Sequence, residues 1–212
     1  LDVLDNDTGV SDEATVEIIS DTSALNGTVA VNEDNTITFV SSLNYFTPEG
    51  GEAEVFEYEV CNPVDAEDPV DDGEPVDENT NCETATVTVI VLPVNDPPVC
   101  DLASASPDSF WPPNHSMSDP VTVIGVTDVD NTADELTIET TGATSDEAEN
   151  GTGDGNTAPD SLTTDGETSV RVERSGNGDG RTYSIAFTAT DIEGASCDGT
   201  VTVTVPHDQR DS

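Results

Sequence analysis

The chain has 212 residues, in which 46 aspartates and glutamates face four arginines and no lysine, so its formal net charge is -42 at pH 7. So many like charges oppose a compact state unless cations neutralise part of them. A nucleic-acid partner is disfavoured because its phosphates would be repelled. No apolar run approaches the roughly 20 residues that cross a bilayer, so membrane insertion is not expected. The partner that this composition predicts is a cation.

Calcium is the cation that the side chains of this chain favour. Carboxylate, asparagine and backbone oxygens suit calcium, whereas zinc prefers cysteine and histidine, and the chain has only two histidines. A generic acidic surface, of the kind that keeps halophilic proteins hydrated in concentrated salt, is the alternative. It accounts for the missing lysines but predicts carboxylates spread evenly, and the two explanations can coexist.

Hydrophobic and aromatic residues make up only 33% and 4% of the chain, so any core is thin. Threonine and valine nevertheless alternate repeatedly, which is the period-2 pattern of half-buried strands. At about 100 to 200 residues per domain, the length allows one or two domains. The sequence therefore predicts an all-β protein.

Strand-like runs occur in two sets, before and after the proline-rich segment at 93–98. Those before it are Leu1 to Leu4, Thr15 to Ile19, Gly27 to Val31, Thr36 to Val40, Val55 to Cys61 and Glu83 to Leu92. Those after it are Val99 to Ala105, Val121 to Thr127, Glu135 to Thr140, Ser169 to Glu173, Thr182 to Thr190 and Gly199 to Val205. Short strands with Gly and Asn turns predict two β-sandwich domains, 1–94 and 99–208, joined by a linker at 95–98.

The first predicted sandwich is one strand short. Its last run, Glu83 to Leu92, has the regular alternation of a final G strand, and counting back through hairpins makes Leu1 to Leu4 strand B. Strand A is then expected before Leu1. It would lie in a longer polypeptide or be supplied by a neighbouring molecule, because an open sheet edge invites strand addition.

Four cysteines allow three pairings, and no CxxC spacing indicates a zinc ribbon or a redox dithiol. Cys61 ends one run and Cys82 opens the next, while Cys100 begins the second half and Cys197 begins its last strand. Pairing within halves, Cys61 with Cys82 and Cys100 with Cys197, is the simplest interpretation, and free buried cysteines are the alternative. Such disulfides imply an oxidising, extracytoplasmic compartment.

Alternating strand direction predicts a cation site at the joint between the two sandwiches. If the first strand of the second sandwich leaves the linker, the segments after its second and sixth strands return beside that linker. Together they bring four carboxylates and two asparagines, enough for the six to eight oxygens that calcium takes. These residues are Asn95, Asp96, Asp128, Asp130, Asn131 and Asp191. A solvated acidic turn is the alternative.

A second cation site is predicted at the far end of the first sandwich, where Asp5 and Asp7 meet the loop Asn62 to Asn81. That loop is rich in Asp, Glu and Pro, with the near-repeats Asp68-Pro69-Val70-Asp71 and Glu74-Pro75-Val76-Asp77. The alternative for it is a disordered acidic loop tethered by a disulfide.

A third cation site is predicted at the lower end of the second sandwich, in a glycine-rich stretch whose backbone can wrap an ion. No twelve-residue EF-hand pattern with its terminal Glu is present there. The candidate ligands are Asp146, Glu147, Asn150, Asp154, Asn156 and Asp160, with Asn177 and Asp179 expected nearby. The alternative is that these carboxylates form salt bridges with the nearby arginines Arg171, Arg174 and Arg181.

An ordered set of motifs runs through the first half: Val3-Leu4-Asp5-Asn6-Asp7, Asn26-Gly27-Thr28-Val29, Asn35-Thr36-Ile37-Thr38-Phe39, Val55-Phe56-Glu57-Tyr58-Glu59-Val60, Ala85-Thr86-Val87-Thr88-Val89 and Val94-Asn95-Asp96-Pro97-Pro98. Together they resemble the cadherin-like tandem repeats of large bacterial surface proteins and adhesins. Residues 99 to 208 resemble an immunoglobulin-like module of secreted bacterial proteins, through Trp111-Pro112-Pro113-Asn114-His115, Gly151-Thr152-Gly153-Asp154-Gly155 and Arg174-Ser175-Gly176.

This resemblance implies two tandem immunoglobulin/cadherin-like β-sandwich domains that serve as calcium-stiffened spacers or adhesion units. The predicted joint is similar to cadherin joints, which have a linker Asn-Asp, a downstream Asp-x-Asp and a later Asp. The chain departs from them at Pro93 and Pro97, where cadherin linkers have ligands, so fewer ions are expected.

Catalysis finds little support in the sequence. Lysine chemistry is excluded because there is no lysine, and His115 lies in the Trp111 loop, where it is expected to fix a turn. We therefore expect a non-enzymatic, calcium-stiffened structural or adhesion module of a secreted or cell-surface bacterial protein, whose partners are adjacent modules or copies of itself. The alternatives are a filament subunit completed by a donated strand and an accessory module of a secreted hydrolase.

Overall fold

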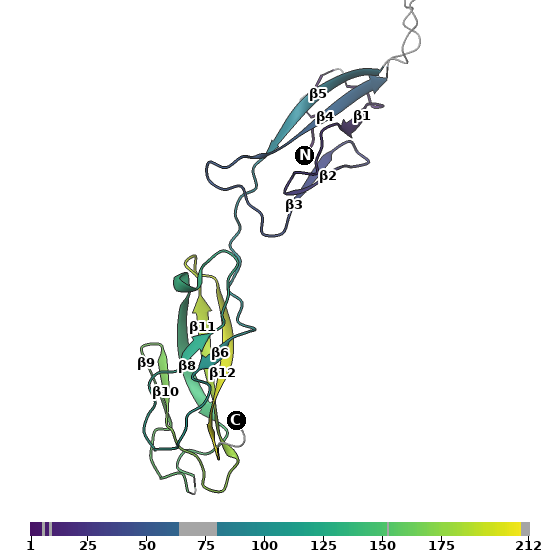
Figure 1. The fold of residues 1–212 in the computed structure, drawn as a ribbon. Helices are drawn as coiled ribbons and strands as arrows, with labels where there is room; N and C mark the ends of the chain where they lie inside the picture. Colours follow the sequence, from purple (N-terminus) through teal and green to yellow (C-terminus); the bar gives the residue numbers. More distant parts are fainter. Residues whose placement is uncertain (6, 9, 64–79, 152, 209–212) are drawn as a thin grey trace, which may run out of the picture. The chain divides into compact units, whose positions relative to one another are not determined.

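The computed structural model describes residues 1–5, 7–8, 10–63, 80–151 and 153–208. The chain divides into two compact units, Leu1–Val94 and Asn95–Ser212 (Figure 1). Apart from one 3-10 turn, η1 (Ala133–Glu135), the regular elements of the described residues are antiparallel strands, which confirms the all-β prediction. In this part of the chain, no helix is long and apolar enough to cross a membrane.

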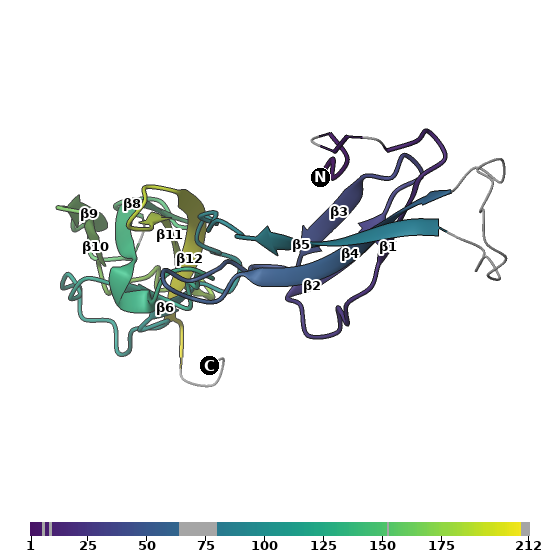
Figure 2. The same ribbon diagram turned by 90° about the horizontal axis from the view of Figure 1, so that it is seen from above.

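The first unit consists of a three-stranded sheet and a two-stranded hairpin. The sheet has the order β1-β4-β5, with β1 (Thr15–Ile18), β4 (Glu54–Pro63) and β5 (Thr80–Val89). The hairpin joins β2 (Gly27–Val31) to β3 (Ile37–Ser41). Figure 2 shows β4 and β5 side by side as one long hairpin. Alternate residues of the strands face inward and form the buried core with two loop residues: Val3, Ala14, Val16, Ile37, Phe56, Tyr58 and Val60.

The predicted strand at Leu1 to Leu4 is not formed as a whole. Leu1 alone pairs with β3, since its amino group donates to Ile37 O at 2.7 Å and its carbonyl accepts from Ile37 N at 2.8 Å. The chain then turns, because Asp7 N donates to Leu4 O at 3.0 Å. Only Val3 of this segment is buried, so the segment contributes one side chain to the core.

The second unit is built on a three-stranded sheet with the order β12-β11-β8. Its strands are β8 (Thr137–Ser145), β11 (Gly180–Thr190) and β12 (Ser196–Pro206). Two short hairpins complete it: β6 (Ser104–Ser106) with β7 (Thr122–Ile124), and β9 (Ser161–Thr164) with β10 (Glu167–Val170). The β9–β10 hairpin lies beside β8 (Figure 1).

Strand β11 carries the longest inward-facing row of the molecule. Its alternate residues Tyr183, Ile185, Phe187 and Ala189 are at most 2% exposed, and they pack against the valines of β12. The same period-2 alternation places Arg181, which is 1% exposed, at the end of this row. A cationic side chain therefore stands where the apolar core ends, and it needs anionic partners there.

Further details differ from the sequence-based expectation. The predicted runs Val121 to Thr127 and Ser169 to Glu173 are strands only over Thr122–Ile124 and up to Val170. The predicted run Val99 to Ala105 is shorter, because Val99 makes only an isolated bridge to Thr127 before the chain turns and continues as β6. Strand β9 was not predicted. Its Ser-Leu-Thr-Thr sequence contains a single apolar residue, Leu162, which is 53% exposed, so it lacks the alternation on which the prediction depends.

Both predicted disulfides are formed. Cys61 pairs with Cys82, which faces it across β4 and β5, and Cys100 pairs with Cys197 over a sequence separation of 97. No cysteine of the described residues is free. The second bridge joins the start of the second unit to its last strand.

The longer bridge is expected to contribute more stability than the shorter one, because a disulfide restricts the unfolded chain in proportion to the logarithm of the loop that it closes. Replacing Cys100 and Cys197 by serine should cost about 4 to 5 kcal/mol, against about 3 kcal/mol for the Cys61 and Cys82 pair. Guanidinium unfolding followed by fluorescence of Trp111, the single tryptophan, measures the first value in the second unit. An unchanged midpoint in the Cys100/Cys197 double variant would contradict the expectation.

Candidate cation site

The candidate site of the second unit lies where its first residues meet two loops of the sheet sandwich. Val99 is hydrogen-bonded in both directions to Thr127, with N to O distances of 2.7 and 3.2 Å, so the segment before Val99 runs beside the loop after β7. One step further, Asp96 N donates to Asp130 Oδ2 at 2.8 Å. The backbone thus brings Asp96 and Asp130 together, as the alternation of strand direction predicts.

The second loop of this site follows β11. Asn95 Nδ2 donates to Asp191 Oδ2 at 2.8 Å, while the other oxygen of Asp191 accepts from Gly194 N at 2.6 Å and Ala195 N at 2.8 Å. These hydrogen bonds, first the one from Asn95, lower the pKa of Asp191. Asp191 is therefore ionised and fixed in orientation before any ligand arrives.

Two oxygen atoms of the loop after β7 remain without a partner. Asp128 Oδ1 accepts from Asp130 N at 2.7 Å and from Asn131 N at 3.0 Å, which folds the loop over the Asp128 carboxylate. Asp128 Oδ2 and Asn131 Oδ1 are both buried, and neither has a hydrogen-bond partner. A buried acceptor without a donor is costly, so these two atoms are available to a cation or to a hydrogen-bond donor.

The donor set at this end is therefore made of oxygens. It consists of carboxylates from three segments with the amides of Asn95 and Asn131, and hard oxygen donors of this kind suit calcium. The described residues contain one group of three His, Cys, Asp or Glu ligand atoms within 4.8 Å of one another, namely Glu59, Cys61 and Cys82. Since its cysteines form a disulfide, that group offers no thiolate to a metal.

At the lower end of the second unit, the carboxylates are paired with an arginine side chain. Here the guanidinium of Arg181 is surrounded by acidic side chains: Glu147 at 3.0 Å, Asp154 at 3.3 Å, Asp160 at 2.5 Å and Glu173 at 3.7 Å. Of the predicted lower-end ligands, Glu147, Asp154 and Asp160 belong to this cluster, as the salt-bridge alternative expects. A cation other than Arg181 at this end stays a prediction.

Two other residues predicted for the lower end, Asp146 and Asn156, are not among the ion-pair partners of the guanidinium. Asp146 is exposed and accepts from Thr182 N at 2.8 Å, and Asn156 is exposed with its N–H on Asp154 Oδ1 at 3.1 Å. The Asp146 carboxylate thus binds the backbone of β11, whereas Asn156 contributes its backbone N–H to a turn held by the Asp154 carboxylate.

Glu173 is the most deeply placed acid of the cluster and is fully buried. Its Oε2 lies 3.2 Å from His115 Nδ1, whereas its Oε1 and Asp160 Oδ1 are buried without a hydrogen-bond partner. Burial raises the pKa of Glu173, and the negative charge of Asp160 raises it further against the opposing effect of His115. Four carboxylates thus surround one guanidinium, and a proton on Glu173 relieves part of the excess charge.

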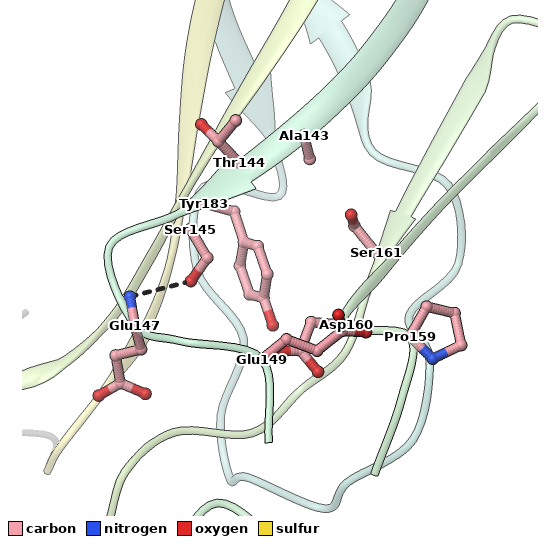
Figure 3. Close-up of a pocket in the computed structure, with 9 residues that line it drawn as sticks. All are labelled: Ala143, Thr144, Ser145, Glu147, Glu149, Pro159, Asp160, Ser161 and Tyr183. Atoms are coloured by element: carbon pink, nitrogen blue, oxygen red, sulfur yellow. Dashed lines mark hydrogen bonds between the residues drawn. The ribbon is translucent and has the colours of Figure 1, made fainter. Parts of the chain in front are cut away.

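A pocket of about 330 Å³ opens beside this cluster. Figure 3 shows the carboxylates of Glu149 and Asp160 near the Tyr183 hydroxyl on one side of it. The Tyr183 hydroxyl donates to Arg171 O at 2.8 Å, and burial raises the pKa of Tyr183 to about 12. The pocket wall is therefore fixed by the same hydrogen bonds that hold Arg181.

At the far end of the first unit, the predicted pair of aspartates is divided. Asp7 lines a pocket of about 410 Å³ together with Asn62 and Asn81, the two ends of the acidic loop. Asp5 is exposed and does not line this pocket. The rest of the predicted site, including both Pro-Val-Asp near-repeats, lies outside the described residues.

Comparison with known proteins gives a likeness of fold only. No family model matches the chain, and no curated protein sequence matches it. Among solved structures, the human desmocollin-1 ectodomain aligns with 90% of this chain at 16% identity and a TM-score of 0.34, over 33% of its own length. The extracellular domain of protocadherin gammaB4 aligns with 89% at 15% identity and a TM-score of 0.33, over 26% of its length.

Mouse cadherin-23 EC22-24 aligns with 91% of this chain at 17% identity and a TM-score of 0.34, over 52% of its own length. The chain therefore spans between about a quarter and a half of these structures. Likenesses of this size assign neither a family nor a function.

Removing the Arg181 guanidinium should destabilise the second unit strongly. Arg181→Gln leaves Glu147, Asp154 and Asp160 without their cation, and a broken buried ion pair costs about 3 to 5 kcal/mol. Arg174→Gln is the matched control, because the hydrogen bonds that Arg174 donates at 2.9 to 3.3 Å go to carbonyl oxygens. Denaturant unfolding should show a loss at least twice as large for Arg181→Gln, and equal losses would contradict the role given to the cluster.

The raised pKa of Glu173 predicts a pH dependence of stability with a definite sign. The folded state holds the proton of Glu173 more tightly than the unfolded state, so its contribution is complete below the ordinary carboxyl value of 4.5 and is lost as the pH rises through the higher folded pKa. Glu173→Gln should remove this loss. Unfolding free energies of both proteins from pH 4 to 8 test it, and parallel curves would show that Glu173 does not titrate in this way.

Proposed function

We propose that this chain is a non-enzymatic, calcium-binding structural or adhesion module of an extracellular protein, of the kind found in bacterial surface proteins. The observation that carries the proposal is the pair of buried, unpartnered oxygens of Asp128 and Asn131, in the loop whose Asp130 accepts from Asp96 N. A calcium ion satisfies such acceptors with the six to eight oxygen ligands that it takes.

The mechanism is electrostatic. When bound, calcium supplies the positive charge that lets these carboxylates approach one another. Asn95 and Asp96, the first residues of the second unit, already contact Asp191 and Asp130 through single hydrogen bonds. With these carboxylates neutralised, both residues are held more firmly on the loops, and the freedom of the segment that follows the first unit is reduced.

The remaining features agree with a structural role outside the cytoplasm. Two disulfides suit an oxidising compartment. Arg181, Asp154, Asp160 and Glu173 form buried ion pairs, which is a use in stability rather than in proton transfer to a substrate. The partners that we propose are adjacent modules or further copies of the chain.

Calcium should raise the melting temperature of the second unit in a saturable manner. At a calcium concentration about 100 times the dissociation constant, the stabilisation is about 2.7 kcal/mol. Asp128→Asn should weaken binding at least tenfold in calorimetric titration, because it removes a charged ligand. Asp134→Asn, an exposed acid of η1, is the matched control and should bind like the original protein.

The acidic-surface alternative makes the opposite prediction for the same proteins. General screening by salt acts on all carboxylates, so sodium chloride at equal ionic strength would stabilise the chain as much as calcium does. The two variants would then respond alike. Either result would remove the calcium proposal.

A further inference from the structure

The disulfide of the first unit lies on the outward face of its sheet. Along β4 the buried residues Phe56, Tyr58 and Val60 alternate with exposed or half-buried ones, and Cys61 belongs to the second set. Its partner Cys82 is directly opposite on β5 and is half-buried as well. Neither cysteine is among the described residues that form the core of this unit or pack against it. A reductant in solution can therefore reach this bridge.

The disulfide of the second unit has a different environment. Cys100 and Cys197 are partly buried, and both pack against the large hydrophobic cluster of β11 and β12. Exposed disulfides are the exchangeable ones in proteins, whereas structural bridges resist reduction. We therefore expect a reductant to open the bridge between Cys61 and Cys82 first.

A carboxylate lies beside the exposed bridge. Glu59 precedes Cys61 by two residues, so the alternation of β4 places both side chains on the outward face. Glu59 Oε2 is 3.4 Å from Cys61 Sγ. The ligand atoms of Glu59, Cys61 and Cys82 all lie within 4.8 Å of one another. Once the bridge is open, this group offers two sulfurs and one carboxylate oxygen from a single small area.

The spacing of these atoms suits a tetrahedral zinc ion. With Zn–S and Zn–O distances of about 2.3 and 2.1 Å, a thiolate sulfur and a carboxylate oxygen on one ion are about 3.6 Å apart. The sulfur of Cys61 and the oxygen of Glu59 are 3.4 Å apart. Two thiolates on the same ion are about 3.8 Å apart. Opposed residues of a strand pair can reach this separation, because their Cβ atoms are about 4.5 to 5.5 Å apart.

We propose that Glu59, Cys61 and Cys82 form a redox-controlled zinc site, in which a zinc ion joins β4 to β5 after a thiol reductant has opened the disulfide. Two reductant thiols are oxidised to a disulfide, and the bond between Cys61 and Cys82 takes up their two electrons and two protons. Zinc then displaces these two protons, because it binds the thiolate form. Water is the fourth ligand. The disulfide and the ion use the same two sulfurs, so only one of them joins the strands at a time.

This zinc site is separate from the calcium sites considered above. The pocket that contains Asp7 is lined by Val60 and Asn62, the two neighbours of Cys61 in β4, and neighbouring residues of a strand point to opposite faces of the sheet. The ligand chemistry differs as well, because soft thiolates select zinc and hard oxygen ligands select calcium. Zinc binding here is therefore independent of calcium binding by the second unit.

The test uses the full chain, reduced with dithiothreitol and freed of it by gel filtration under argon. Cobalt(II) is the spectroscopic probe for the zinc site. The reduced protein should give the sulfur-to-cobalt charge-transfer band and the visible bands of a tetrahedral ion, and zinc should abolish both by displacing the cobalt. The oxidised protein should give neither band, and calcium should not displace the cobalt. A reduced protein without the charge-transfer band would overturn the proposal.

The contribution of each ligand is measured with variants of the reduced protein. Glu59→Gln should weaken zinc binding by about tenfold or more, because it removes a charged ligand. Glu57→Gln is the matched control, since Glu57 is exposed and lies two residues earlier on the same face of β4. Equal affinities in these two variants would exclude Glu59 as a ligand. The double variant Cys61→Ser/Cys82→Ser should lose the charge-transfer band, and a band that persists would assign the thiolates to Cys100 and Cys197 instead.

Amide hydrogen exchange shows whether the ion takes the place of the disulfide. Reduction should speed the exchange of the β4 and β5 amides beside the cysteines, and zinc should slow it again, because metal binding stabilises the folded hairpin. The double serine variant should exchange at the same rate with and without zinc. If zinc leaves the exchange of the reduced protein unchanged, the ion does not join the two strands and the proposal is wrong.

Discussion

The shortage of cationic side chains is the constraint to which the rest of this molecule responds. With 46 acidic residues and four arginines, most carboxylates must be stabilised by water, by backbone N–H groups or by ions from solution. The structure uses the second means repeatedly, as at Asp34, Asp128 and Asp191, each of which accepts hydrogen bonds from the residues that follow it. Backbone donors are neutral, however, so they orient a carboxylate without cancelling its charge.

The second unit shows two outcomes of this constraint at opposite ends of one sandwich. At one end a guanidinium from the core row of β11 gathers four carboxylates, of which Asp160 and Glu173 each keep one buried oxygen without a hydrogen bond. At the other end the acids accept from backbone N–H groups and from Asn95, and Asp128 Oδ2 and Asn131 Oδ1 have no hydrogen-bond partner. Among the described residues, the arginine ion pairs all lie at the first of these ends.

Sequence patterning was sufficient for the strands that are half-buried and alternate. The sequence predicts the runs that form β2, β4, β11 and β12, because alternating threonine and valine residues are typical of a pleated, half-buried strand. The segment at Leu1 to Leu4 was predicted as a strand but pairs only at its first residue. An exposed strand such as β9 carries no such signal, because both of its faces are polar or open to solvent.

The site residues likewise divide into those that a sequence pattern predicts and those that it does not. Strand direction alone brought Asn95, Asp96, Asp130 and Asp191 to one end, since it requires only the order of the strands. The role of Arg181 needed one more step, because extending the inward positions of β11 by two residues identifies it as buried. Glu173 could not be found in this way. It follows the end of β10 and is buried through a long-range contact with His115 that no local pattern encodes.

The bridge between Cys100 and Cys197 gives the second unit a particular response to mechanical tension. A force applied along the chain enters this unit at Asn95 and leaves through β12, and the disulfide connects these two segments directly. The 97-residue separation between its cysteines is therefore bypassed, which removes roughly 300 Å of possible extension at about 3.4 Å per residue. Under load, β8, β11 and the whole arginine cluster lie within the covalent loop and are shielded, whereas the segments outside it, which include β12 after Cys197, can be drawn out.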